Sequence, residues 1–397
     1  MPLSPRRLLL TALASLLCLL GGVGAATASA STMPAEGIFE SCTLDTQMQT
    51  CLNRLQVMHQ GGIKVVVMPA SWTSLNALAT YAGAAHSLGM SVMWALGDQG
   101  WWQSPATSTN MAGYYGGFTS ACGCNQNGPL ISYIAHWLGA LPGTYGYYAA
   151  DDSMLSAGDR AGVAAYVARI KQQDPSHTLM ISAANGGQAT TYQGVADTVG
   201  QEIYPKTTTS LLPVNANQDI WGGVAQEVKD TQRAANNAGK QSTFILQAFS
   251  WGDNLDDGTA IGECSPSESK LACYQHLPYP SGGEQLALRN TVLKNAHPKL
   301  ILWWSFQGTY GQAGNDTYSI YPTGSGAAAH WAGLAAAILA PAPVTAVKAK
   351  VASKRKPAHT ARTHKRHKRT HARRHVHHAK RHAKRHTKRH ATLQARV

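Results

Sequence analysis

Short apolar runs alternate with helical patterns eight times between about residue 33 and residue 340. The apolar runs have the length and composition of buried strands, and apolar residues recur at helical spacing between them. We expect the strands at residues 37–40, 63–68, 91–96, 145–150, 178–182, 198–204, 243–249 and 300–306. Eight strand–helix units in one domain, residues 31–340, predict a single (β/α)8 TIM barrel rather than an open doubly wound sheet.

Helix-start and turn patterns agree with this prediction. Ser156 with Asp159, and Ser281 with Glu284, have the spacing of a capping box in the first turn of a helix. No Gly-x-Gly-x-x-Gly turn follows the first strand, which argues against a dinucleotide-binding fold. The helical pattern after the fifth strand is the weakest of the eight.

Residues 1–30 have the composition of a secretory signal peptide. Arg6 and Arg7 precede the apolar run 8–20, and small residues at 26–28 or at 28–30 form a cleavage site. A transmembrane anchor is the alternative, but the run is short for one, and no later segment reaches about 18 uninterrupted apolar residues. We therefore expect a secreted protein without an integral membrane segment.

Basic residues are concentrated in the C-terminal segment, residues 341–397. Of the chain's 34 Lys and Arg, 19 lie there with 10 His and no acid, so the rest of the chain holds 15 basic residues against all 20 acidic ones. The mildly acidic body gives no charge argument for nucleic-acid binding by the barrel. The segment cannot bury a core, and we expect a disordered tail.

Three uses of this tail are open. It could simply keep the protein solvated, or its histidines could capture metal. We favour electrostatic adhesion to an anionic cell-surface or extracellular polymer, which places the secreted protein at the cell wall. Histidine charging below pH ~6.5 would tighten such adhesion in acid.

Six cysteines remain when Cys18, in the signal segment, is set aside: Cys42, Cys51, Cys122, Cys124, Cys264 and Cys273. An even number in an exported chain predicts disulfides. The simplest pairing is local, Cys42 with Cys51 and Cys264 with Cys273. Cys122 and Cys124 would close a very tight ring, so they could instead be free, strained or metal-binding. Because further ligands at suitable spacing are lacking, we expect no metal, and no motif calls for a cofactor.

Acidic residues mark the carboxyl ends of several expected strands. The carboxyl ends of parallel strands form one rim of a barrel, which is where such folds hold their chemistry. The acids at or just past the strands are Glu40, Asp98, Asp151, Asp152, Glu202 and Asp253. Because side chains alternate along a strand, Asp151 and Asp152 point to opposite sides, and one of them faces the barrel mouth.

Aromatic and amide residues lie close to these acids in the sequence. They are Trp72, Trp101, Trp102, Tyr204, Trp251, Trp304 and Phe306, with Asn185, Gln247 and Gln307. Such a set suits a sugar, because a pyranose face packs on an aromatic ring, amides bind its hydroxyls and two carboxyls cleave the glycosidic bond. The alternative is that the Trp residues fill the core and that some acids pair with Arg or Lys. Serine-elbow, zinc and phosphate-loop motifs are missing from the sequence.

Five segments together resemble the glycoside-hydrolase-like TIM barrels found in exported bacterial proteins. They are residues 37–40 with Cys42 and Cys51, 146–153, 197–205, 246–251 and 302–306. In that family the fourth strand commonly ends Asp-Glu-Pro, and the sixth carries an acid two residues before Tyr-Pro. The resemblance implies Asp152 as general acid and Glu202 as the second carboxylate, base or nucleophile, with Asp151 tuning or orienting them.

This chain departs from the family pattern at two positions. Asp152 replaces a Glu and is shorter by one methylene, and Gln247 stands where many retaining glycosidases have a nucleophilic Glu. We expect a secreted, monomeric glycoside hydrolase that acts on a polysaccharide. The expected glycan-binding residues are Glu40, Trp72, Asp98, Trp101, Trp102, Tyr204, Gln247, Trp251 and Trp304. The alternatives are a non-catalytic carbohydrate- or cell-wall-binding barrel anchored by its tail, and, third, another secreted barrel hydrolase or a protein of purely surface-structural use.

Overall fold

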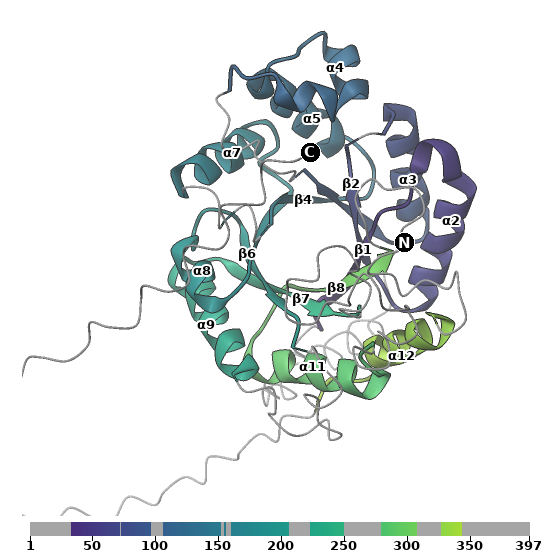
Figure 1. Cartoon of the computed structure of the whole chain (residues 1–397), viewed down its shortest axis with the longest axis vertical. Coiled ribbons are helices and arrows are strands. Elements are labelled where there is room, and N and C mark those ends of the chain that lie inside the picture. The colour runs from purple at the N-terminus through teal and green to yellow at the C-terminus, as the bar shows by residue number, and fades with distance from the viewer. Residues whose placement is uncertain are drawn as a thin grey trace, which may run out of the picture. The chain divides into compact units, whose positions relative to one another are not determined.

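The computed structural model describes residues 33–71, 73–96, 106–151, 155, 160–205, 223–249, 279–307 and 327–343. Eight strands form a closed barrel in sequence order, every neighbouring pair is parallel, and β8 pairs with β1 (Figure 1). The strands are β1 (Ala35–Glu40), β2 (Val65–Pro69), β3 (Ser91–Ala95), β4 (Thr144–Ala150), β5 (Thr178–Ala183), β6 (Thr198–Ile203), β7 (Gln241–Gln247) and β8 (Leu300–Gln307). The predicted (β/α)8 barrel is confirmed.

Helices surround the ring of strands (Figure 1). One follows each strand: α2 (Leu44–Gln60), α3 (Leu75–Ser87), α5 (Asn127–Gly139), α7 (Arg160–Gln173), α8 (Gly186–Thr191), α9 (Val224–Asn237), α11 (Gly282–Asn295) and α12 (Ala327–Leu339). The connection from β3 to α5 adds a short 3-10 helix, η2 (Asn110–Gly113), and α4 (Gly116–Cys122). The capping box predicted at Ser281 and Glu284 is present at the start of α11.

The strands are buried on both faces, so the barrel has an inner and an outer core. Val67, Met180 and Leu302 belong to the cluster inside the ring. Their sequence neighbours Val66, Ile181 and Trp303 belong to the larger cluster between strands and helices. This alternation decides which rim side chains face the barrel mouth.

Strand β4 is irregular near its start, at Tyr145, and again near its carboxyl end, between Tyr148 and Ala150. Its register shifts against β3 and again against β5. At Gly146, φ is +154°, and an added Cβ would lie 1.9 Å from the carbonyl oxygen of Thr178 on β5. Glycine is therefore required there, because only a residue without a side chain allows this approach of the two backbones.

Two disulfides lie in the described part of the chain, Cys42–Cys51 and Cys122–Cys124. The first confirms the expected local pairing, and the second shows that the tight ring is closed. Cys264 and Cys273 lie outside the described residues, as do residues 1–30, where a signal peptide is expected, and the segment from residue 344. Within the described ranges, no helix combines the length and apolar character needed to cross a membrane.

Candidate functional site

Glu202 lies on the inner face of the barrel at the carboxyl end of β6. It is register-paired with Ile245, which belongs to the inner core. It is also the only residue of β6 that is not buried, so its carboxylate reaches the open end of the ring. The buried Ser182 hydroxyl on β5 donates a hydrogen bond of 3.1 Å to Glu202 Oε1, which fixes the orientation of the carboxylate.

An amide and an indole lie on the same inner face, on the next two strands. Gln247 at the end of β7 is register-paired with Trp304 on β8. Gln247 is buried and donates from Nε2 to the carbonyl oxygen of Phe249 at 3.1 Å. Trp304 is half-buried, in contrast to its buried neighbours on β8, and the peptide bond that follows it is cis.

Aromatic rings surround these polar groups. Trp304 packs on Phe39 of β1 with ring centroids 4.6 Å apart, and Phe39 meets Tyr148 of β4 edge to face at 5.3 Å. Tyr204, just past β6, packs edge to face on Phe249 at 5.1 Å. The arrangement joins aromatic surface, one amide and one carboxylate at a single end of the barrel.

Asp151 directly follows β4 and is half-buried at the same rim. Its carbonyl oxygen accepts a hydrogen bond from the N–H of Leu155 at 3.0 Å. Asp152, the expected general acid, lies outside the described residues. So do the expected binding residues Trp72, Asp98, Trp101, Trp102 and Trp251.

Glu40 lies on the opposite face of its strand from Phe39. Its Oε1 accepts hydrogen bonds from Arg54 on α2 at 3.2 Å and from the Ser41 N–H at 3.0 Å. Burial raises the pKa of Glu40 to about 7, although the Arg54 charge and backbone N–H groups act in the other direction. The structure therefore places this carboxylate between β1 and α2, apart from the inner face that holds Glu202.

Sequence reasoning named Glu202, Gln247, Tyr204 and Trp304, and the structure brings these four together at the mouth. It did not name Ser182, Phe39, Tyr148 and Phe249, which contact or surround them. Ser182 could have been found from the sequence, because it is a polar residue at the end of the strand expected at residues 178–182, directly after an apolar run. For the three aromatic residues no such signal existed, because a core ring and a rim ring look alike in sequence.

The geometry supports the binding and activation of an uncharged, hydroxyl-rich ligand. Glu202 can accept a proton or hydrogen bonds, Gln247 supplies an amide, and the rings supply apolar stacking surface. No three His, Cys, Asp or Glu side chains among the described residues are arranged to hold a metal. Fold and rim thus define a (β/α)8 barrel with an inward-facing carboxylate among aromatic and amide side chains.

No protein-family model matches the chain, and a search of curated proteins finds no match either. Solved structures that resemble it include a β-galactosidase from the psychrophilic Marinomonas ef1, with 10% identity and a TM-score of 0.49 over 76% of this chain and 59% of that one. A GH113 β-1,4-mannanase has 9% identity and a TM-score of 0.46 over 77% and 97% of the two chains. Pseudomonas stutzeri endoglucanase Cel5A has 11% identity and a TM-score of 0.43 over 76% of this chain and 94% of that one.

The chain therefore spans about three fifths of the length of the β-galactosidase, and nearly all of the other two. An aldolase, QR15, is also similar, with 8% identity and a TM-score of 0.36 over 68% of this chain and 88% of that chain. Apart from the aldolase, the neighbours named here are glycoside hydrolases.

Proposed function

We propose that the protein is an exported glycoside hydrolase that acts on a polysaccharide at the carboxyl-terminal rim of the barrel. The observation that carries the proposal is Glu202, an accessible carboxylate on the inner face that is held by Ser182 and flanked by an amide and an indole. Carboxylates of barrel enzymes at this end of the strands are in position for catalysis.

Glycosidic bonds are cleaved by two carboxyl groups, one that protonates the leaving oxygen and one that acts as base or nucleophile. Glu202 takes the second role and Asp152 the first, with Asp151 beside it on the same strand end. Trp101, Trp102, Tyr204, Trp251 and Trp304 stack on successive sugars. Trp72, Asp98 and Gln247 are the further binding residues of this proposal. Glu40 is left out of it, because its carboxylate is buried between β1 and α2 and binds Arg54.

The test is the release of reducing ends from a panel of soluble and insoluble polysaccharides. Glu202→Gln and Asp152→Asn keep side-chain size and remove the charge, and each should lower kcat/KM by about 10²–10⁴-fold. Asp230→Asn, which alters an acid on α9 that pairs with Arg233, is the matched control and should keep full activity. Unchanged turnover in both rim variants refutes the proposed pair.

A second function, glycan binding without hydrolysis, is favoured by Gln247. Strand β7 ends in this neutral amide where the resembled family often has a nucleophilic Glu, so the retaining pair of two glutamates is incomplete. If the wild-type protein releases no product yet retains a glycan with equal affinity in Glu202→Gln, the binding function replaces the enzymatic one.

Export and cell-wall attachment belong to the same proposal. The buried Cys42–Cys51 disulfide suits an oxidising compartment, and the first 30 residues have signal-peptide composition. We propose that the protein works as a monomer and that its basic tail binds anionic surface polymers.

A further inference from the structure

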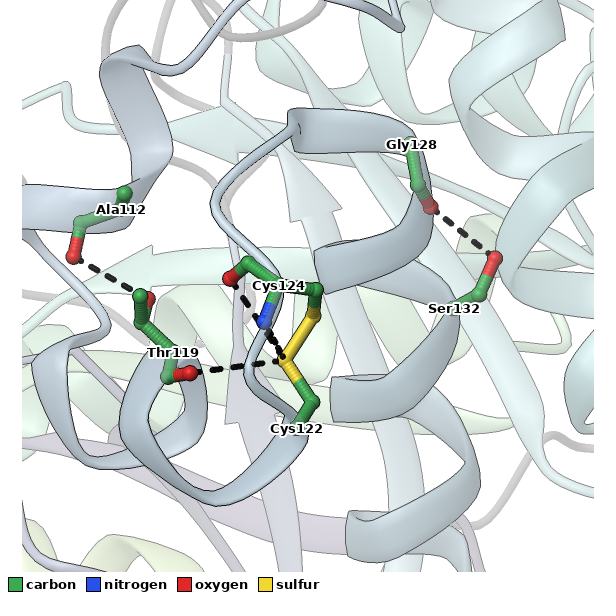
Figure 2. Close-up of a disulfide and its surroundings, with 6 residues drawn as sticks. All are labelled: Ala112, Thr119, Cys122, Cys124, Gly128 and Ser132. Atoms are coloured by element: carbon green, nitrogen blue, oxygen red, sulfur yellow. Dashed lines mark hydrogen bonds between the residues drawn. A yellow bond between two sulfur atoms is a disulfide. The ribbon is translucent and has the colours of Figure 1, made fainter.

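The Cys122–Cys124 disulfide lies at a turn on the surface, between α4 and α5. Cys122 ends α4, Gly123 has a left-handed backbone with φ +64°, and Cys124 returns beside Cys122 (Figure 2). Both cysteines are half-buried, and Ala121, Gly123 and Asn125 around them are exposed. A Cβ added to Gly123 would have no heavy atom within 4 Å, so one side of the ring is open to solvent.

The other disulfide of the described chain provides a contrast. Cys42 is 5% exposed and Cys51 is 0% exposed, within the core between β1 and α2. Its two cysteines are separated by 9 positions, against 2 for Cys122 and Cys124. A disulfide that closes a longer loop removes more conformational entropy from the unfolded chain, so Cys42–Cys51 should stabilise the fold more than Cys122–Cys124 does. The barrel should therefore tolerate reduction of Cys122–Cys124 more easily.

The reduced state of Cys122 has hydrogen-bond partners already in place. The Cys124 N–H donates to Cys122 Sγ at 3.2 Å, and this donor stabilises a thiolate at that sulfur. The carbonyl oxygens of Thr119 and Cys124 lie 3.7 and 3.5 Å from the same sulfur and can accept from a thiol S–H (Figure 2). Both protonation states of a released Cys122 are thus accommodated.

We propose that Cys122-Gly123-Cys124 is a thiol–disulfide exchange site, with low-molecular-weight thiols as its co-reactants. An incoming thiolate attacks Cys124 Sγ, the bond between the two sulfurs breaks, and Cys122 leaves as the thiolate that the Cys124 N–H stabilises. A second thiol then attacks the mixed disulfide. The products are two protein thiols and one oxidised disulfide of the co-reactant, and two electrons pass to the protein.

The experiment follows both disulfides in the same folded, oxidised full-length protein. The protein is incubated with reduced glutathione, quenched in acid, alkylated, and mapped by peptide mass spectrometry. Cys122 and Cys124 should become alkylated at least about tenfold faster than Cys42 and Cys51, because accessible disulfides exchange more readily than buried ones. The glutathione adduct trapped at early times should lie on Cys124.

Two results overturn the proposal: equal reduction rates for the two disulfides, or free Cys122 and Cys124 in the protein purified without reductant. An adduct on Cys122 instead overturns the assigned direction of attack. The variant Cys122→Ser, incubated with oxidised glutathione, should exchange its Cys124 thiolate for one half of that disulfide, releasing one reduced glutathione and leaving a stable adduct on Cys124 that no internal thiol removes. Circular dichroism shows whether that variant is folded, and the wild-type mapping does not depend on it.

Discussion

At the scale of single residues, the acids of this barrel divide by the face of the strand on which they lie. Glu202 points inward and is accessible, whereas Glu36 and Glu40 point outward from β1 and each meets an arginine. Arg289 Nε donates to Glu36 at 2.7 Å, and Arg54 donates to Glu40 at 3.2 Å. Burial raises the pKa of both carboxyls, more than the arginines lower it. These two acids hold helices α11 and α2 on the barrel.

Glu40 should make the stability of the fold depend on pH. Its pKa is raised by burial from 4.5 to about 7, so the folded state binds a proton that the unfolded state releases between these values. The contribution is therefore fully present below pH 4.5 and is lost as pH rises to about 7, a change of about 3 kcal/mol. Glu40→Gln keeps an oxygen acceptor for Arg54 and should remove this part of the slope. Urea unfolding at pH 5 and pH 7.5 measures it.

The variant Asp230→Asn serves again as the control, because this surface acid pairs only with its helical neighbours on α9 among the described residues. It should reproduce the wild-type difference between the two pH values. A Glu40→Gln protein with the same pH slope as the wild type would show that folding does not raise the pKa of Glu40 into this range.

The two faces of β1 also show what the sequence could and could not determine. Alternation predicts that Phe39 and Glu40 point in opposite directions, but it does not say which of them faces the barrel interior. On β6, alternation places Glu202 and Tyr204 on one face of the strand, and the structure shows that this face points to the inner core. On β1, Glu40 faces outward because it pairs with Arg54, which lies 14 residues further along the chain on α2. This pairing depends on how the helix packs on the strand, and the sequence alone does not show it.

At the scale of elements, strands were predicted closely and short helices were not. The strand expected at 63–68 begins at Val65, and the one expected at 198–204 ends at Ile203. The segment after β3 contains two short helices, η2 and α4, that the sequence pattern did not indicate. Its helical character comes from tertiary contacts, since Phe118 is fully buried and meets Trp137 of α5 edge to face at 5.5 Å.

The contact between α11 and α12 depends on glycine. A Cβ on Gly282 would lie 2.8 Å from both Cα and O of Gly333, and these backbone atoms cannot move without separating the helices. Gly282→Ala should therefore lower the free energy of unfolding by about 1–3 kcal/mol. Gly283, the next residue of the same turn, meets only Ser281 Oγ at 4.0 Å. Gly283→Ala should be neutral or stabilise by up to about 1 kcal/mol. Urea denaturation compares the two, and equal losses would contradict the close packing.

At the scale of the whole molecule, most of the positive charge lies in the segment that follows the barrel, and the part of the chain before it is mildly acidic. The 19 Lys and Arg beyond Pro341 are attached to a body with five more acids than bases. Arg289, which also binds Glu36, donates from Nη1 to the carbonyl oxygen of Ala340 at 3.1 Å, so the barrel holds the chain up to the point where the basic segment begins. Removal of the segment should therefore leave the barrel intact if the cut falls after Pro343.

A protein that ends at Pro343 should lose adhesion to anionic polymers while keeping whatever activity the barrel has. The full chain should be retained on a polyanion-coated surface at ~0.05 M salt and released near ~0.5 M, because exposed charges are screened over a few ångströms at high ionic strength. Retention should strengthen from pH 7.5 to pH 5 as the ten tail histidines gain charge. A chain with these histidines changed to glutamine separates the two effects, since it should bind at pH 7.5 and gain nothing in acid. Equal retention of the shortened protein would assign adhesion to the barrel surface instead.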